Sequence, residues 1–267
     1  MLNANLLLRS LLALSLVQIP VAFAQDWPNK PIRYIVPFAP GGATDMVGRM
    51  VAQGLSKSLN QSVVVDNKAG QGGSVGSAEL AKSKPDGYTL GGGTISSHAL
   101  NVALYPKLPY DPSKDFAPVT LLAALPNVLV VHPSLNVKTV PELIALLKAN
   151  PNKYSFGSAG NGTSQHISGE MFKLATGTQM QHVPYRGSGP MMADLLGGTI
   201  QISFENSNTA IPQVTGKKLI GLAVTSAKRS KAAPELPTLQ EASLDGFELS
   251  SWPVSYTHLT LPTKRIV

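Results

Sequence analysis

Hydrophobic and polar positions follow two alternating patterns along the chain. Short apolar runs typical of strands alternate with stretches in which apolar residues recur every three or four positions, as in amphipathic helices. The first pair predicts a strand at 32–38 and a helix at 45–59, whose apolar face would consist of Met46, Val47, Met50, Val51, Leu55 and Leu59. Alternating strands and helices with short connections favour an α/β fold with parallel sheets covered by helices on both faces.

The same pattern continues to the end of the chain in two series. Strands are predicted at 62–65 (a buried one), 88–90, 154–157, 181–185, 200–204 and 219–224, and helices at 77–82, 164–175, 190–196 and 207–215. A long apolar stretch, 119–131, separates the two series and is interrupted only by Pro126. Thr139 and Glu142 have capping-box spacing, which predicts a helix from there to about residue 149.

Residues 1–24 have the features of a cleavable secretory signal. Arg9 precedes the apolar run 10–17, and Ala22-Phe23-Ala24 is an A-x-A cleavage site. The run is too short for a permanent membrane anchor, and no other stretch is long and apolar enough to span a bilayer. We therefore expect an exported, soluble mature protein.

Composition excludes some kinds of chemistry. The 267 residues include no cysteine, so disulfides, thiol nucleophiles and Cys-ligated metals are ruled out.

The formal charge is +7, but residues 25–252 hold 19 basic and 15 acidic residues, a charge of +4. Without dense Lys/Arg runs, this excess gives weak support for nucleic acid binding. The histidines form no metal-binding spacing, so we expect no metal site and no cofactor.

The C-terminal residues 253–267 look foreign to the rest. Residues 254–263, VSYTHLTLPT, resemble the translation of an adapter used in sequencing libraries, and Pro253 fits the junction. The alternative interpretation is an ordinary Thr-rich strand. We therefore expect 253–267 to be a non-native tail.

Two glycine-rich loops each stand between a predicted strand and a predicted helix. They are PGGATD at 40–45 and SAGNGTS at 158–164. Helix N-termini carry unpaired N–H groups and partial positive charge, and glycines let a ligand approach them closely. Each loop is therefore a candidate seat for a carboxylate or phosphate, and two facing loops would form a clamp.

Five motifs in series carry a family resemblance: PFAPGGATD, PDGYTLGGG, FGSAGNGTSQHISGEMF, HVPYRGSGPMMADLLGG and PTLQEASLDGFELSSW. Over residues 25–252 the chain resembles the Bug or TctC-like periplasmic solute-binding proteins of tripartite tricarboxylate transporters. The resemblance implies a type II periplasmic-binding-protein fold, in which two α/β domains enclose a ligand cleft and are joined by two crossover strands. On that basis domain 1 is 25–125, lacking its C-terminal part, domain 2 is 126–247, and 248–252 begins the return crossover.

The resemblance also implies a function without catalysis. A periplasmic, monomeric receptor would capture a di- or tricarboxylate, an amino acid or an aromatic acid, and deliver it to membrane transporter subunits. The ligand-binding residues it implies are Phe38, Ala39, Gly41, Gly42, Thr44, Asp45, Thr94, Ser96, Ser158, Gly160, Asn161, Gly162, Thr163, His166, Tyr185 and Arg186.

Several of these residues have alternative interpretations. Asp45 either stabilises its helix or faces an amine or hydroxyl of the ligand. His166 and Arg186 either line the cleft or lie on the surface. Relatives often carry Asp where this chain has Glu205, which puts any contact carried over to that position in doubt. The segment 72–76 matches G-x-S-x-G, but residues 67–71 separate it from its strand, so we expect a helix-start loop rather than a nucleophile elbow.

Two other functions remain open at this point. An exported enzyme acting on a small anion would need a nucleophile or an acid–base pair, for which the sequence offers only Asp45, His166 and Glu205. A ligand-sensing subunit of a signalling system would look the same in sequence.

Overall fold

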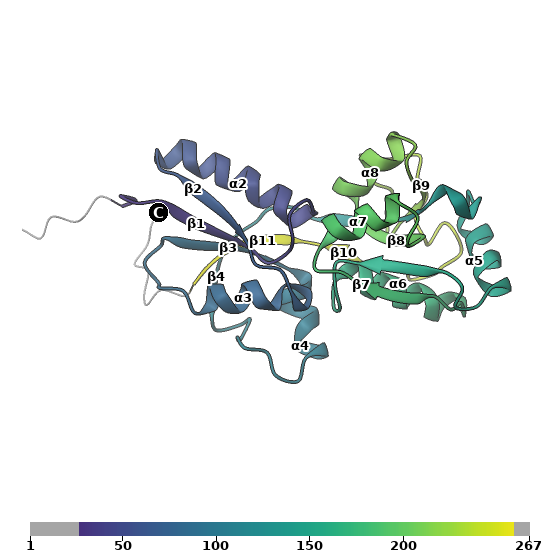
Figure 1. The fold of residues 1–267 in the computed structure, drawn as a ribbon, viewed down its shortest axis with the longest axis horizontal. Coiled ribbons are helices and arrows are strands. Elements are labelled where there is room, and N and C mark those ends of the chain that lie inside the picture. Colours follow the sequence, from purple (N-terminus) through teal and green to yellow (C-terminus); the bar gives the residue numbers. More distant parts are fainter. Residues whose placement is uncertain (1–26, 259–267) are drawn as a thin grey trace, which may run out of the picture.

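The computed structural model describes residues 27–258, which form two α/β lobes in a row (Figure 1). Each lobe has one sheet with helices on both faces, so the expected fold class is confirmed. The predicted secretory signal lies outside the described residues, and so do residues 259–267. Among the described residues, no helix has the length and apolar character needed to span a membrane.

The first sheet has five strands in the order β2-β1-β3-β11-β4. Its strands are β1 (Ile32–Val36), β2 (Val63–Asn67), β3 (Thr89–Thr94), β4 (Phe116–Leu121) and β11 (Pro253–His258). β1 is parallel to β2 and β3, whereas β11 is antiparallel to both β3 and β4. The sheet is therefore mixed rather than purely parallel. Its helices are α2 (Ala43–Leu59), α3 (Ser74–Ala81) and α4 (Asn101–Leu104).

The second sheet has six strands, with β10-β5-β8-β6-β7 in order and β9 paired to β5. The strands are β5 (Leu125–Val131), β6 (Ser155–Ser158), β7 (Gln181–Pro184), β8 (Ile202–Asn206), β9 (Ile220–Val224) and β10 (Ser250–Ser251). The helices are α5 (Val140–Ala149), α6 (Ser164–Thr176), α7 (Ser188–Leu196) and α8 (Ser207–Thr215). β6, β7 and β8 run parallel, and β5 is antiparallel to β8 and β9.

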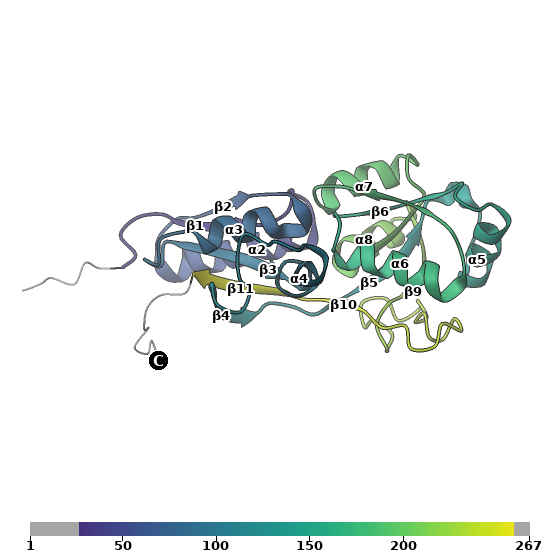
Figure 2. The same cartoon turned by 90° about the horizontal axis from the view of Figure 1, so that it is seen from below.

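Between residues 27 and 258 the chain passes from one lobe to the other twice. Residues 122–124 connect β4 to β5, and Trp252 connects β10 to β11. The apolar stretch 119–131 is thus two strands in different sheets rather than one element. Residues 253–258, expected to begin a non-native tail, form a strand between β3 and β4 (Figure 2). This agrees with the alternative interpretation of that segment as a strand, while its origin as adapter sequence stays a prediction.

The core of the second lobe lies on both faces of its sheet, because β5 is buried on both sides. Val128 and Val130 point to the face covered by α7 and α8, and Leu129 and Val131 to the face covered by α5 and α6. All four are fully buried. A continuous apolar run is the pattern expected of a strand covered on both faces.

Helix α2 packs through a different face from the one its apolar pattern predicts. Met46 and Met50 are 44% and 71% exposed, while Ala43, Gly48 and Ala52 are buried. A Cβ on Gly48 would lie 2.8 Å from Cγ2 of Val36, so only a very small residue lets the helix approach β1 this closely. The strand predicted at 62–65 is present as β2, but its predicted burial is wrong, because β2 lies at the edge of the sheet.

The capping box forms in modified form at the start of α5. The Thr139 hydroxyl accepts from the Glu142 amide at 3.3 Å, as predicted. The Glu142 carboxylate accepts from the amide of Lys138 at 2.7 Å, one residue before the expected partner. Both contacts satisfy backbone donors near the start of the helix.

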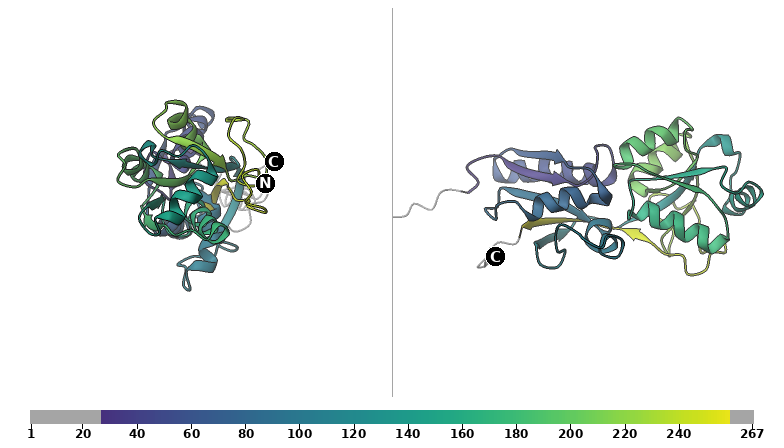
Figure 3. Two further views of the ribbon diagram at one scale, coloured as in Figure 1. Left: turned by 90° about the vertical axis from the view of Figure 1, so that its right-hand side faces the viewer. Right: turned by 60° about the horizontal axis from the view of Figure 1, so that its bottom comes forward.

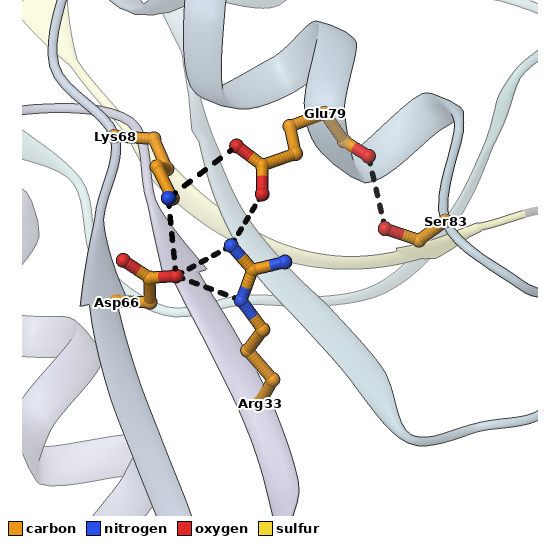
Figure 4. A network of polar contacts seen from close by, with 5 residues as sticks. All are labelled: Arg33, Asp66, Lys68, Glu79 and Ser83. Atoms are coloured by element: carbon orange, nitrogen blue, oxygen red, sulfur yellow. Dashed lines mark hydrogen bonds and ion pairs between the residues drawn. The ribbon is translucent and has the colours of Figure 1, made fainter.

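An ion-pair network ties α3 to the first sheet (Figure 4). Arg33 of β1 lies between Asp66 of β2 and Glu79 of α3 and donates to both carboxylates. Lys68 pairs with the same two carboxylates at 3.5 and 3.8 Å. Partial burial alone would raise the pKa of Asp66, but the hydrogen bond and charge of Arg33 outweigh it and lower that pKa.

We expect Arg33→Met to reduce the free energy of unfolding at neutral pH by about 1 kcal/mol, because partly exposed ion pairs contribute little individually. The folded-state pKa of Asp66 is lowered, so this contribution is present above the carboxyl's ordinary pKa of 3.8 and is lost as pH falls through the folded-state value. Urea unfolding at several pH values measures it. Lys57→Met, at an exposed position without an ion pair to a described residue, is the control. An equal loss in both variants would contradict the network's role.

Candidate functional site

A cavity lies where the two lobes meet, and both contribute to its wall. Its lining residues are Phe38, Gly42, Ala43, Thr44, Thr94 and Ser96 from the first lobe, Ala159, Thr163, Ser164, Gln165, Ser188 and Asn206 from the second, and Ser251 of the crossover strand. The cavity is narrow, with a volume of about 20 Å³, which is room for about one water molecule.

Uncharged hydrogen-bonding groups dominate this wall. Seven of the thirteen lining residues carry a hydroxyl, and none carries a charge. The hydroxyls of Thr44, Ser96 and Ser251 form no side-chain hydrogen bond with any described residue. They are therefore available to a bound molecule.

Three helix N-termini converge on the cavity. α2 begins beside Gly42, α6 beside Thr163 and α7 beside Ser188, and all three of these residues line the wall. The first amides of each helix lack intrahelical acceptors and carry partial positive charge. An arrangement of this kind attracts an anion without any cationic side chain.

Glycines bring the two lobes into backbone contact on one side of the cavity. A Cβ on Gly189 would overlap the carbonyl oxygen of Pro40, and one on Gly187 would lie 2.8 Å from the amide nitrogen of Ala39. That amide donates to the Arg186 carbonyl at 3.1 Å. The first glycine-rich loop therefore packs directly on the start of α7.

A second backbone contact closes the other side. A Cβ on Gly72 would overlap the carbonyl oxygen of Asn161, and Gly162 lies against the side chain of Asn101. Gly72 has φ +58° and Gly73 φ +93°, so this turn favours glycine at both positions. The G-x-S-x-G segment thus combines a turn at Gly72 and Gly73 with the first three residues of α3, and the turn contacts the second glycine-rich loop.

The structure brings six of the sixteen residues implied by the resemblance to the cavity wall: Phe38, Gly42, Thr44, Thr94, Ser96 and Thr163. The other ten lie in the same loops but outside the wall: Ala39, Gly41, Asp45, Ser158, Gly160, Asn161, Gly162, His166, Tyr185 and Arg186. Direct ligand contact stays a prediction for all sixteen.

Asp45 stabilises the first loop. Its buried carboxylate accepts from the Gly41 amide at 3.0 Å, from Arg49 at 3.0 Å and from Asn67 at 2.9 Å. Burial would raise its pKa, but the hydrogen bonds from Arg49, Gly41 and Asn67 lower it. This arrangement matches the helix-stabilising interpretation of Asp45.

Two stacked histidines stabilise the second loop. Nδ1 of His166 accepts from the Gly162 amide at 3.2 Å, and Nε2 of His182 lies 2.7 Å from Oγ of Ser158. The imidazole centroids are 4.2 Å apart. Burial lowers the pKa of both rings, that of His182 to about 4, so both are neutral at pH 7.

Tyr185 and Arg186 lie outside the cavity wall. The Tyr185 hydroxyl donates to Asp194 at 2.6 Å, and the Arg186 side chain is exposed.

The three residues that could serve an enzyme form no hydrogen bond with one another. They are Asp45, His166 and Glu205. Among the described residues no cluster of His, Asp and Glu could hold a metal ion.

The resemblance missed seven wall residues: Ala43, Ala159, Ser164, Gln165, Ser188, Asn206 and Ser251. Two had a usable signal, since Asn206 lies two residues after the predicted strand 200–204 and Ser188 follows the glycine of YRGSGP. In α/β sheets, ligands bind beyond the carboxyl ends of strands, where both residues lie.

Comparisons with known proteins agree on one family. The family model described as "Tripartite tricarboxylate transporter family receptor" matches residues 47–258. Protein BugT of Bordetella pertussis is 40% identical over 230 residues, which are 86% of this chain and 71% of BugT.

Solved structures of similar proteins share the fold. Rpa4515 of R. palustris with adipate has a TM-score of 0.86 at 39% identity, covering 89% of this chain and 80% of that one. MatC from Rhodopseudomonas palustris with bound malate has a TM-score of 0.83 at 30% identity, with 88% and 80% covered. The periplasmic binding protein BugD has 0.85 at 33%, with 89% and 79% covered.

We expect Gly189→Ala to prevent the closed contact between the lobes, because the added methyl overlaps the Pro40 carbonyl while the backbone of Gly189 needs no positive φ. Small-angle X-ray scattering should show a larger radius of gyration, with a melting temperature close to wild type. Gly54→Ala is the control, because its methyl would have no neighbour within 4 Å. Identical scattering from Gly189→Ala and wild type would contradict this role for the glycine.

Proposed function

Because the chain belongs to the tripartite tricarboxylate transporter receptor family, we propose that it binds a small carboxylate in the cavity between its two lobes and presents it to the membrane subunits of such a transporter. It is a solute-binding receptor rather than an enzyme. The observation that carries the ligand class is the convergence of three helix N-termini on a wall of uncharged donors.

The wall suits a carboxylate in two respects. Amides at the starts of α2, α6 and α7 supply partial positive charge, and the hydroxyls of Thr44, Ser96 and Ser251 supply unused donors. Hydrogen bonds to an ionised acceptor are roughly twice as strong as neutral ones. The similar structures holding adipate and malate support the same ligand class.

Ligand capture would couple to a hinge motion. Within residues 27–258, only 122–124 and the segment around Trp252 connect the two sheets, which leaves each lobe free to move as a body (Figure 3). Closure around the ligand excludes water and strengthens the hydrogen bonds inside. The backbone contacts at Gly72 and Gly189 would form on closure.

The receptor works in the periplasm, as BugD does. We infer that residues 1–24 direct its export and are then removed. We further infer that it acts as a monomer, since one lobe pair encloses the whole cavity.

A thermal-shift panel of di- and tricarboxylates, amino acids and aromatic acids tests the ligand class. A ligand at 100 times its dissociation constant should add about 2.7 kcal/mol to the free energy of unfolding. We expect a rise in melting temperature with at least one carboxylate and none with neutral sugars. A panel without any shift, on protein shown to be folded, would reject the carboxylate proposal.

Thr44→Val should weaken binding of that carboxylate by about 1.5–3 kcal/mol, roughly 13- to 160-fold in dissociation constant, because it removes one hydroxyl that donates to a charged group without changing the shape of the side chain. Isothermal titration calorimetry measures the change. The control is Thr120→Val on β4, an exposed threonine outside the cavity wall. Equal affinities of Thr44→Val and wild type would exclude the Thr44 hydroxyl as a donor to the ligand.

A further inference from the structure

A fully buried carboxyl group lies directly behind the cavity wall. Glu205 is on β8, opposite Val128 of β5, and has no exposed surface. Its nearest polar neighbours include the side chains of Ser188 and Gln165, two residues that line the cavity. These two are hydrogen-bonded to each other, from Nε2 of Gln165 to Oγ of Ser188 at 3.1 Å.

The contacts of this carboxyl suit its protonated form. Oγ1 of Thr209 lies 2.6 Å from Oε1 of Glu205 and 2.9 Å from the carbonyl oxygen of Asn206. A threonine hydroxyl has one hydrogen, so it either shares that hydrogen between the two oxygens or donates to one of them. A protonated Glu205 satisfies both contacts fully, because it can donate its own proton to Thr209 while Thr209 donates to the carbonyl.

The other carboxyl oxygen supports the same conclusion. Oε2 of Glu205 is buried and has no hydrogen-bond partner among the described residues. An ionised oxygen in that position would have only neutral donors near it, from Ser188, Gln165 and the Asn206 backbone. Ionising it therefore costs more than burying a neutral carbonyl oxygen. Burial correspondingly raises the pKa of Glu205.

In the part of the chain that the structure describes, no cation compensates a charge at this position. The elements packed on β8 are β5, β6, α6, α7 and α8, and β5, β6 and α8 carry no titratable side chain. On α6 and α7 the titratable residues are each engaged elsewhere: His166 with Gly162, Glu170 with Lys173, and Asp194 with Tyr185. Across the cavity, Asp45 pairs with Arg49.

We propose that Glu205 sets the charge selectivity of the cavity: the receptor binds a carboxylate only while Glu205 is protonated, so that anion affinity depends on pH. This proposal rests on the proposed function. An ionised Glu205 behind Ser188 and Gln165 would repel an anion at the wall, whereas the neutral acid does not. The ionised form would instead favour a ligand carrying an ammonium group near α7.

Binding therefore loses strength as pH rises through the pKa of Glu205. By linkage, affinity should fall by up to tenfold for each pH unit above that pKa, because one proton must be taken up with the ligand. A neutral residue of the same shape at position 205 should bind the anion without this dependence.

The first experiment measures dissociation constants for adipate, malate and the panel's best carboxylate by calorimetry, from about pH 6 to pH 9, for wild type and Glu205→Gln. We expect wild-type affinity to fall with pH and Glu205→Gln to match wild type at pH 6 and stay constant. Glu170→Gln, on the surface side of α6, should retain the wild-type profile. A pH-independent wild type, or a Glu205→Gln variant at least tenfold weaker at pH 6, would overturn the proposal.

The second experiment needs no ligand and separates the two proposals. The folded-state pKa of Glu205 is raised, so its contribution to stability is fully present below the ordinary pKa of 4.5 and is lost as pH rises through the folded-state value. The melting temperature of wild type relative to Glu205→Gln should therefore decrease with rising pH. If no carboxylate binds either protein, the proposed function fails; a constant difference would by itself overturn the neutral state of Glu205.

Discussion

The close approach of backbone to backbone at glycines is the constraint on which the site depends. Gly189 meets the Pro40 carbonyl on one side of the cavity, and Gly72 meets that of Asn161 on the other. Side chains at these positions would hold the lobes apart, and the residues of the two lobes would no longer share one wall. The same approach allows amides at three helix starts to face a common volume. The glycine-rich loops therefore allow the two lobes to come into contact, in addition to offering contacts to a ligand.

The groups that attract an anion to this cavity are uncharged amides and hydroxyls rather than cationic side chains. Cationic side chains are absent from the cavity wall, and the charged residues nearest to it, such as Asp45 and Arg49, satisfy each other. Fixed amides and hydroxyls need little reorganisation when an anion arrives, since helix geometry already orients them. The buried carboxyl of Glu205 is compatible with this design only as a neutral acid, because its surroundings offer no compensating charge.

Much of the fold was predictable because local patterns determine it. Most strands and helices begin and end within a few residues of their predicted bounds, and α8 matches at both ends. The errors share one cause, which is packing between distant segments. Gly48 shifted the packed face of α2 towards small residues, and β2 became an edge strand rather than a buried one. Neither follows from the apolar pattern of one segment.

By itself, the sequence determined the two glycine-rich helix starts, the α/β order and the family, because these depend on residues close together along the chain. Only the tertiary structure decided which groups face the cavity. Asp45 and His166 became supports for the loops, while Gln165, Asn206 and Ser251 entered the wall. Asp45 bonds to Asn67 of β2, and the wall joins segments as distant as Gly42 and Ser251, so this information appears only when both lobes are folded and in contact.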